Sequence, residues 1–210
     1  MAVEPTKRIC LVAGSTGLIG NFLVKELAKS DIEVIALTRN EYFSENQQVI
    51  YKTVDFDKKE SFEQLFKNVT DVFICLGTTI NKAGSKESFR KVDVDYSFSI
   101  AEAASKASVP NLSLVTSIGA DSKSNNFYLK CKGEVEELIS SLPFQSLFKK
   151  TLTKQNNNLI GVPENVNFDE RDATTVDETN EHNRKILENA LLVILTSLNK
   201  ITKKKISIPR

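Results

Sequence analysis

The chain has 210 residues, of which 40% are hydrophobic and 26% charged, and 28 basic residues nearly balance 27 acidic ones to give a net charge of +1. This composition is typical of one globular domain with a real core, and it lacks the basic excess of a nucleic-acid-binding protein. The chain has one histidine and three cysteines, and none of the cysteines has a metal-like spacing, so a zinc site is not expected. We expect a cytoplasmic protein with reduced cysteines.

Short apolar runs alternate with helical patterns along most of the chain. Strands are expected at residues 8–13, 33–38, 48–54, 71–76 and 112–117, and helices at about 18–30, 58–68, 85–107 and 127–141. Strands that alternate with helices of this length predict βαβ units and a parallel sheet with helices on both faces. The predicted fold class is therefore α/β, a Rossmann-type doubly wound parallel sheet in the order 3-2-1-4-5-6 with an irregular C-terminal region.

The alternation stops near the end of the chain. Residues 153–183 are rich in Asn, Asp, Glu and Thr and predict a long irregular loop, whereas residues 184–200 predict a helix with one apolar stripe. We therefore expect a Rossmann domain at 1–148 and a divergent C-terminal segment at 149–210 that packs on the same domain.

Membrane association is not expected. The longest apolar run, ALLVIL, is far too short to span a bilayer, which needs roughly 20 residues. No small-residue cleavage site follows the charged N-terminus. The stripe at 184–200 fits a packed core helix better than a helix lying on an anionic membrane surface.

A glycine-rich loop, GSTGLIG, follows the first predicted strand and opens the first helix. Such glycines allow a tight turn, a close approach to a pyrophosphate and close packing of helix on strand, while the helix N-terminus favours negative charge. A glycine turn without a ligand is the alternative, but the position in a βαβ series favours a cofactor. The residues expected to contact it are Gly14, Thr16, Gly17, Leu18, Ile19 and Gly20.

The end of the second predicted strand bears on the choice between NAD and NADP. Thr38, Arg39 and Asn40 include no carboxylate for the ribose 2′-hydroxyl of NAD, whereas Arg39 can accept the 2′-phosphate of NADP. We therefore expect NADP as the cofactor. The nearby Glu41, and a purely solvated role for Arg39, leave NAD open.

Further cofactor contacts are expected where the third and fourth strands end. Asp55 and Phe56 would border the adenine unless they are ordinary loop residues, and Gly77 offers a surface without a side chain beside the cofactor. The contact residues expected at these two strand ends are Asp55, Phe56, Leu76, Gly77 and Thr78.

The string FYLKCKG places Tyr128 four residues before Lys132, so both share one face of the helix predicted there. A nearby ammonium favours the phenolate, which makes Tyr128 usable as a general acid, and Lys132 could also bond the nicotinamide ribose. Of Thr116 and Ser117 at the end of the fifth strand, alternation lets only one face this site. The alternative is a strand-end hydroxyl beside an exposed basic helix.

These motifs resemble a known family. The strings CLGTTINKAGSKESFRKVDVDY and SIGADSKSNNFYLKCKGEVEEL are similar to the atypical or extended short-chain dehydrogenase/reductases, and most of all to their Tat-interacting oxidoreductase-like NAD(P)-binding members. The resemblance covers about residues 8–147. It implies a Rossmann fold, NADPH binding, and Ser117, Tyr128 and Lys132 as the catalytic residues.

The chain departs from that family at two places. Asp93 stands where many short-chain reductases have asparagine, which puts a proton relay through this position in doubt. After LPFQSL, relatives continue with a hydrophobic strand and an Arg-Pro-Gly turn, whereas this chain reads FKKTLTKQNNN. The region that would shape the substrate pocket is therefore divergent.

Two classes of function follow. The first is an NADP(H)-binding oxidoreductase of the short-chain type that acts on a small-molecule carbonyl or hydroxyl substrate. The second is an NADPH-sensing or interaction protein with little turnover, and a nucleotide-sugar epimerase is a weaker third. The sequence does not identify the substrate, and it leaves a homodimer open.

Overall fold

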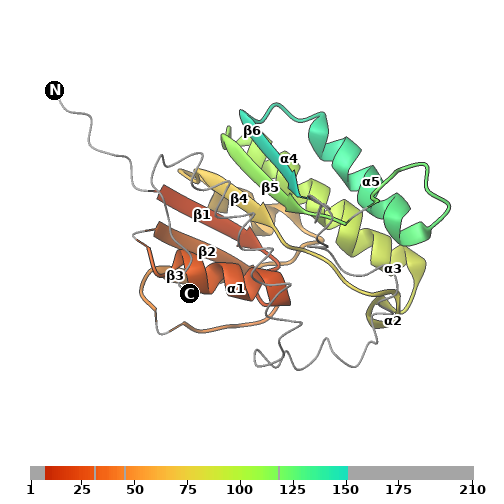
Figure 1. Ribbon diagram of the computed structural model, residues 1–210. Helices are drawn as coiled ribbons and strands as arrows, with labels where there is room; N and C mark the ends of the chain where they lie inside the picture. Colours follow the sequence, from red (N-terminus) through yellow and green to blue (C-terminus); the bar gives the residue numbers. More distant parts are fainter. Residues whose placement is uncertain (1–7, 31, 45, 118, 151–210) are drawn as a thin grey trace, which may run out of the picture.

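The computed structural model describes residues 8–30, 32–44, 46–117 and 119–150. They build one six-stranded sheet in the order β3-β2-β1-β4-β5-β6, with every neighbouring pair parallel, which confirms the predicted fold class and strand order (Figure 1). The strands are β1 Arg8–Ala13, β2 Ile32–Thr38, β3 Val49–Thr53, β4 Asp71–Ile74, β5 Asn111–Val115 and β6 Ser146–Lys150.

The α-helices of this part of the chain are α1 Leu18–Leu27, α2 Ile80–Ala83, α3 Lys86–Arg90, α4 Ser97–Lys106 and α5 Phe127–Ser140. The helix expected at 58–68 is wrong. Two 3-10 turns, η1 Lys59–Ser61 and η2 Glu63–Phe66, stand there instead, because Phe62 between them leaves the helical region at φ −132°. The helix expected at 85–107 contains a π-helical segment, η3 Lys91–Tyr96, between α3 and α4.

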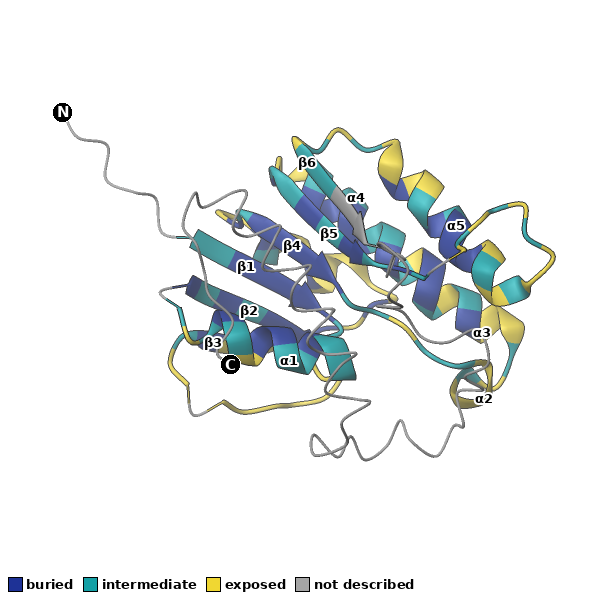
Figure 2. Ribbon diagram, viewed as in Figure 1, coloured by how far each residue is buried: buried dark blue, intermediate teal, exposed yellow. Residues whose placement is uncertain are grey.

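Helices cover both faces of the sheet because the side chains of β1 alternate between two apolar cores. Cys10 and Val12 pack in the core with α1, whereas Leu11 and Ala13 pack in the larger core with α4 and α5. Figure 2 shows that buried residues run along the middle of the sheet and that exposed residues lie on the outer sides of the helices. For this reason β1 is apolar at nearly every position after Arg8.

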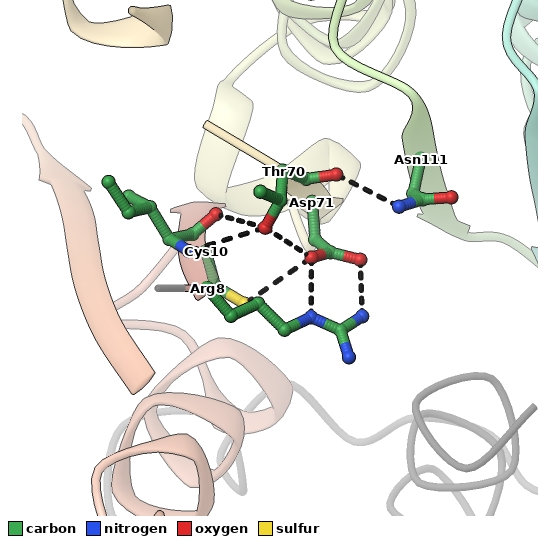
Figure 3. Close-up of polar contacts among 6 residues, drawn as sticks. Arg8, Cys10, Thr70, Asp71 and Asn111 are labelled. Carbon is green, nitrogen blue, oxygen red and sulfur yellow. Dashed lines mark hydrogen bonds and ion pairs between the residues drawn. The ribbon is translucent and has the colours of Figure 1, made fainter. Parts of the chain in front are cut away.

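The amino ends of β1, β4 and β5 are tied together by polar contacts (Figure 3). Arg8 donates two hydrogen bonds to Asp71, at 2.7 Å to Oδ2 and 2.6 Å to Oδ1. The Thr70 hydroxyl donates to Asp71 at 2.7 Å, and Asn111 Nδ2 donates to the Thr70 carbonyl at 3.0 Å. Burial raises the pKa of the neighbouring Cys10 thiol. These contacts therefore hold the amino ends of the three strands together, and the loops of the candidate site lie at the opposite, carboxyl ends of the strands.

The strand β6 ends at Lys150, two residues past the expected domain boundary at 148. The rest of the expected C-terminal segment 149–210, with its predicted loop and helix, lies outside the described residues. Within the part that the structure does describe, no helix combines the length and the apolar character needed to cross a bilayer.

Candidate functional site

The glycine loop between β1 and α1 is held against the loop after β4. Gly14 has φ +83°, and a Cβ on it would lie 2.5 Å from the carbonyl oxygen of Cys75. A Cβ on Gly20 would overlap the carbonyl oxygen of Gly14. The buried Ser15 hydroxyl donates to the carbonyl of Leu37 at 2.7 Å, which fixes the loop to β2. These close approaches explain why the loop needs glycine.

The N-terminus of α1 fits a phosphate. Its N-cap is Gly17, and no side chain caps the helix, so the first-turn N–H groups remain available to an anion. Thr16 and Gly17 are exposed, and Leu18 is half-buried. The side chain of Ile19 packs against the apolar core between α1 and the sheet, so this residue would contact a phosphate through its backbone N–H.

Arg39 follows β2 directly and is exposed. Among the residues that the structure describes, its guanidinium has no hydrogen-bond or ion-pair partner. The preceding Thr38 hydroxyl donates to the carbonyl of Asn40 at 2.6 Å, which tightens the turn in which Arg39 lies. Glu41 is exposed as well. The position is therefore open to an anionic group of a ligand.

Asp55 and Phe56 lie just past β3, which pairs with β2 up to Thr38 and Thr53. Asp55 accepts from the backbone N–H of Asp57 at 3.0 Å, so its carboxylate closes a turn. Phe56 is buried and stacks on Tyr96 with ring centroids 5.5 Å apart. The ring of Phe56 belongs to the core, and this residue would border an adenine only through its backbone.

The loop after β4 meets a buried ion pair. The Lys132 ammonium lies 2.7 Å from Asp93 Oδ1, as an ion-pair contact rather than a directed hydrogen bond, while Asp93 Oδ2 accepts from the backbone N–H of Thr78 at 2.9 Å. A Cβ on Gly77 would lie 3.7 Å from Asp93 Oδ1 and 3.9 Å from Lys132 Nζ. Leu76 before it packs on the core. Gly77 therefore lies directly beside this pair, with no side chain between them.

Burial is the largest influence on the Asp93 carboxyl group and raises its pKa. The Lys132 ammonium and the Thr78 N–H act in the opposite direction, but they do not cancel the loss of solvation. Both side chains are almost fully enclosed, at 1% exposure for Asp93 and 7% for Lys132. Charged side chains are rarely this buried unless they form an ion pair with each other.

Tyr128 lies in the first turn of α5, which begins with the Asn126 side chain accepting from the backbone N–H of Leu129. Its side chain is 39% exposed, and its ring packs edge-on against Phe89 with centroids 6.0 Å apart. The Lys132 ammonium lies 5.8 Å from the centre of the Tyr128 ring. The predicted i, i+4 pair is thus brought together at one end of α5.

The two hydroxyl residues after β5 differ in their surroundings. Thr116 is buried, and its hydroxyl donates to Glu136 on α5 at 2.6 Å. Ser117 is half-buried, and its carbonyl accepts from the backbone N–H of Ala120 at 3.2 Å. The Thr116 hydroxyl therefore already has a structural partner.

Sequence reasoning missed the partnership of Asp93 with Lys132. The one signal available was a carboxylate at a position where related reductases have an amide. That signal carries no information on burial, and the π-helical segment that contains Asp93 has no sequence pattern of its own.

These features define a class of protein. The glycine loop follows β1 and the Gly77 loop follows β4, on either side of the point where the strand order reverses. Doubly wound sheets bind dinucleotides at this carboxyl edge. The fold and site are those of a Rossmann nucleotide-binding protein of the oxidoreductase-like kind.

Residues 14–144 match the model of the NAD(P)H-binding family, and the chain belongs to that family. Protein HTATIP2 of Rattus norvegicus is 34% identical over 141 residues, which are 65% of this chain and 58% of that protein. Protein FMP52, mitochondrial, of Debaryomyces hansenii is 34% identical over 136 residues, which are 63% of this chain and 60% of that protein. The resemblance to the Tat-interacting oxidoreductase-like proteins is confirmed, over about 60% of the relatives' length.

Among solved structures, the oxidoreductase ylbE from Lactococcus lactis superposes with a TM-score of 0.56 at 20% sequence identity, covering 70% of this chain and 71% of that one. At this identity the likeness concerns the fold alone. Within the described residues, no group of His, Cys, Asp and Glu side chains could hold a metal ion.

Proposed function

We propose that this chain is an NADP(H)-dependent oxidoreductase of the short-chain dehydrogenase/reductase type, acting on a small-molecule carbonyl or hydroxyl substrate. One observation carries the proposal. Gly14 abuts Cys75 at the start of the loop after β4, Gly77 in the same loop lies beside Lys132, and Lys132 lies beside Tyr128. The loop proposed to bind phosphate and the proposed acid–base pair therefore lie close together at the carboxyl ends of the strands.

The roles of the side chains follow from their positions. A bound nicotinamide cofactor would supply the hydride. Tyr128 is proposed to pass a proton to the substrate oxygen, since its side chain is 39% exposed. The Lys132 ammonium would stabilise the phenolate and bond the cofactor ribose. Ser117, half-buried just past β5, is proposed as the hydroxyl that holds the substrate oxygen, as the family resemblance implies.

The preference for NADP over NAD rests on Arg39, which is exposed at the end of β2 with no carboxylate at the positions on either side of it. Calorimetric titration should show tighter binding of NADPH than of NADH. Arg39→Ala should remove most of the difference, about 10- to 100-fold for a charge-assisted contact to the 2′-phosphate. Lys106→Ala, on the outer side of α4, is the charge-matched control. Equal wild-type affinities for the two cofactors would contradict the preference.

Reduced nicotinamides absorb at about 340 nm, so the oxidation of NADPH can be followed at that wavelength. The reaction itself is tested in this way with a panel of aldehydes, ketones and quinones. Turnover of any member, lost in Ser117→Ala, supports the proposal. NADPH binding without turnover favours the second candidate, an NADPH-sensing or interaction protein. That candidate is favoured by the divergent sequence of residues 148–183, the region that would shape a substrate pocket.

We also propose a cytoplasmic location, because Cys10, Cys75 and Cys131 are all free thiols. The Debaryomyces hansenii relative is named as mitochondrial, so the two compartments are the alternatives to be compared. Fractionation of cells that express the tagged full-length protein decides between them. Recovery with the mitochondrial fraction would contradict the proposed location.

A further inference from the structure

Helix α5 contains a glycine in its interior. Gly133 is buried there, directly after Lys132. Glycine in the middle of a helix costs roughly 1 kcal/mol relative to alanine, so the helix itself gives no reason for this residue. The reason must lie in a contact with another part of the chain.

The contact is made by the loop that joins β5 to α5. A Cβ on Gly133 would lie 2.1 Å from the backbone nitrogen of Ser122 and 2.2 Å from the carbonyl carbon of Asp121. The Asp121 N–H also donates to the carbonyl of Leu129 on α5 at 3.1 Å. The backbone of the loop therefore lies directly on the backbone of the helix, and only a residue without a side chain leaves room for it.

Both ends of this loop belong to the proposed site. The loop follows Ser117, and it ends where α5 begins, with Tyr128 in the first turn of the helix. The Ala120 N–H donates to the Ser117 carbonyl at 3.2 Å, so a tight turn leads from Ser117 to Asp121. A displacement of the loop at Asp121 is therefore passed on to Ser117 through this turn.

The helix is the more firmly held of the two partners. Three side chains of α5, those of Cys131, Val135 and Ile139, are buried in the larger core, whereas residues 119–126 of the loop are exposed or half-buried. A side chain added at Gly133 would therefore displace the loop and leave the helix in place. Non-bonded heavy atoms ordinarily lie roughly 3.5–4 Å apart, so the loop backbone would move by more than about 1 Å.

We propose that Gly133 is a positioning residue for Ser117, because its missing side chain lets the loop after β5 pack on α5 and so fixes the place of the Ser117 hydroxyl relative to Tyr128. The inference rests on the proposed function, in which Ser117 holds the substrate oxygen and Tyr128 supplies the proton. Gly133 is covered by the loop and acts through it. A displacement of about 1 Å can lower the rate of a catalysed step by about 100-fold.

The test combines single-turnover kinetics with calorimetric titration of NADPH, both on the full chain and with a carbonyl compound that the wild type reduces. Gly133→Ala should slow hydride transfer by about 10- to 100-fold. NADPH affinity should stay within about twofold of the wild type, and the midpoint of the pH–rate profile should not move, because Tyr128 and Lys132 keep their places on α5. A glycine with a purely structural role would change stability and leave the rate of the folded protein unchanged.

Ser122→Ala is the matched control. The Ser122 hydroxyl donates to Glu137 on α5, but the contact with Gly133 is made by the backbone of Ser122. This variant should therefore transfer hydride within about twofold of the wild-type rate.

Four results would overturn the positioning role: a wild-type rate in Gly133→Ala, weaker NADPH binding by that variant, a shifted pH–rate profile, or an equal loss of rate in Ser122→Ala. A wild type that binds NADPH but reduces no compound overturns the proposed function instead, and the inference with it.

Should Gly133→Ala fail to fold, Ser122→Gly gives a second test. Glycine at this position creates no clash with α5, but it loosens the backbone of the loop where it meets the helix. Hydride transfer in Ser122→Gly should be slower than in Ser122→Ala by about threefold or more, with equal NADPH affinity. Equal rates in the two variants would overturn the inference.

Discussion

Gly14→Ala should separate the two demands that the glycine loop places on its first residue. The backbone of Gly14 is left-handed, at φ +83°, which costs an L-residue roughly 1–2 kcal/mol. In addition, the new Cβ would lie 2.5 Å from the oxygen and 2.6 Å from the carbon of the Cys75 carbonyl. Overpacking of this kind adds about 1–3 kcal/mol, because backbone atoms cannot turn aside as a side chain can.

Gly84→Ala supplies the control, since Gly84 has φ +81° at the end of α2 and a Cβ there would meet nothing within 4 Å. It should show the conformational cost alone. We expect Gly14→Ala to lower the free energy of unfolding by about 3 kcal/mol and Gly84→Ala by about 1 kcal/mol. The first corresponds to a fall in Tm of roughly 6–12 °C for a chain of this size.

Thermal and urea unfolding measure the stability change, and calorimetric titration measures NADPH affinity. Only Gly14→Ala should also weaken NADPH binding, by about tenfold or more, because its loop must move away from β4 and carry the phosphate-binding amides with it. If the two variants lose equal stability, the contact with Cys75 is not what requires glycine. If Gly14→Ala keeps full NADPH affinity, the loop does not hold the cofactor.

Two further predictions concern residues away from the proposed acid–base pair. Asp71→Ala should lower the free energy of unfolding by about 3–5 kcal/mol in urea titrations, because it leaves Arg8 partly buried without its partner. A loss below about 1 kcal/mol would show that this ion pair does not hold the amino ends of the strands together. Burial raises the pKa of Cys75 to about 12, so its thiol should stay protonated at neutral pH. It should therefore react with a disulfide reagent far more slowly than in the unfolded chain, and the reaction should become faster only as the pH rises. Equal rates in the folded and unfolded chains would contradict that assignment.

The sheet was predictable because its central strands β1 and β4 are nearly continuous apolar runs that are buried on both faces, and parallel order then follows from the helices between the strands. The glycine loop was predictable for a similar local reason, because the close backbone approaches at Gly14 and Gly20 require glycine, and glycines are visible in the sequence. The stretch 58–68 was not predictable. Phe62 and Phe66 have helical spacing and are both buried, but two 3-10 turns bury them equally well.

Contacts between residues that are far apart in the sequence were harder still to predict. Nothing local shows that the ring of Phe56 stacks on Tyr96 in the core, or that Thr116 donates to Glu136. The ion pair of Asp93 and Lys132 joins residues 39 positions apart through a π-helical segment, whose extra residue per turn defeats a helical-spacing argument. Such partners are fixed by tertiary packing alone.

Single-turnover kinetics of Tyr128→Phe test whether Tyr128 is the acid of the proposed NADP(H)-dependent reduction. The variant keeps the ring that packs on Phe89 and removes only the hydroxyl. With a carbonyl compound that the wild type reduces, we expect a hydride-transfer rate lower by about 10²- to 10⁴-fold, with NADPH affinity unchanged within about twofold. Reduction of the compound at the wild-type rate would show that Tyr128 is not the acid.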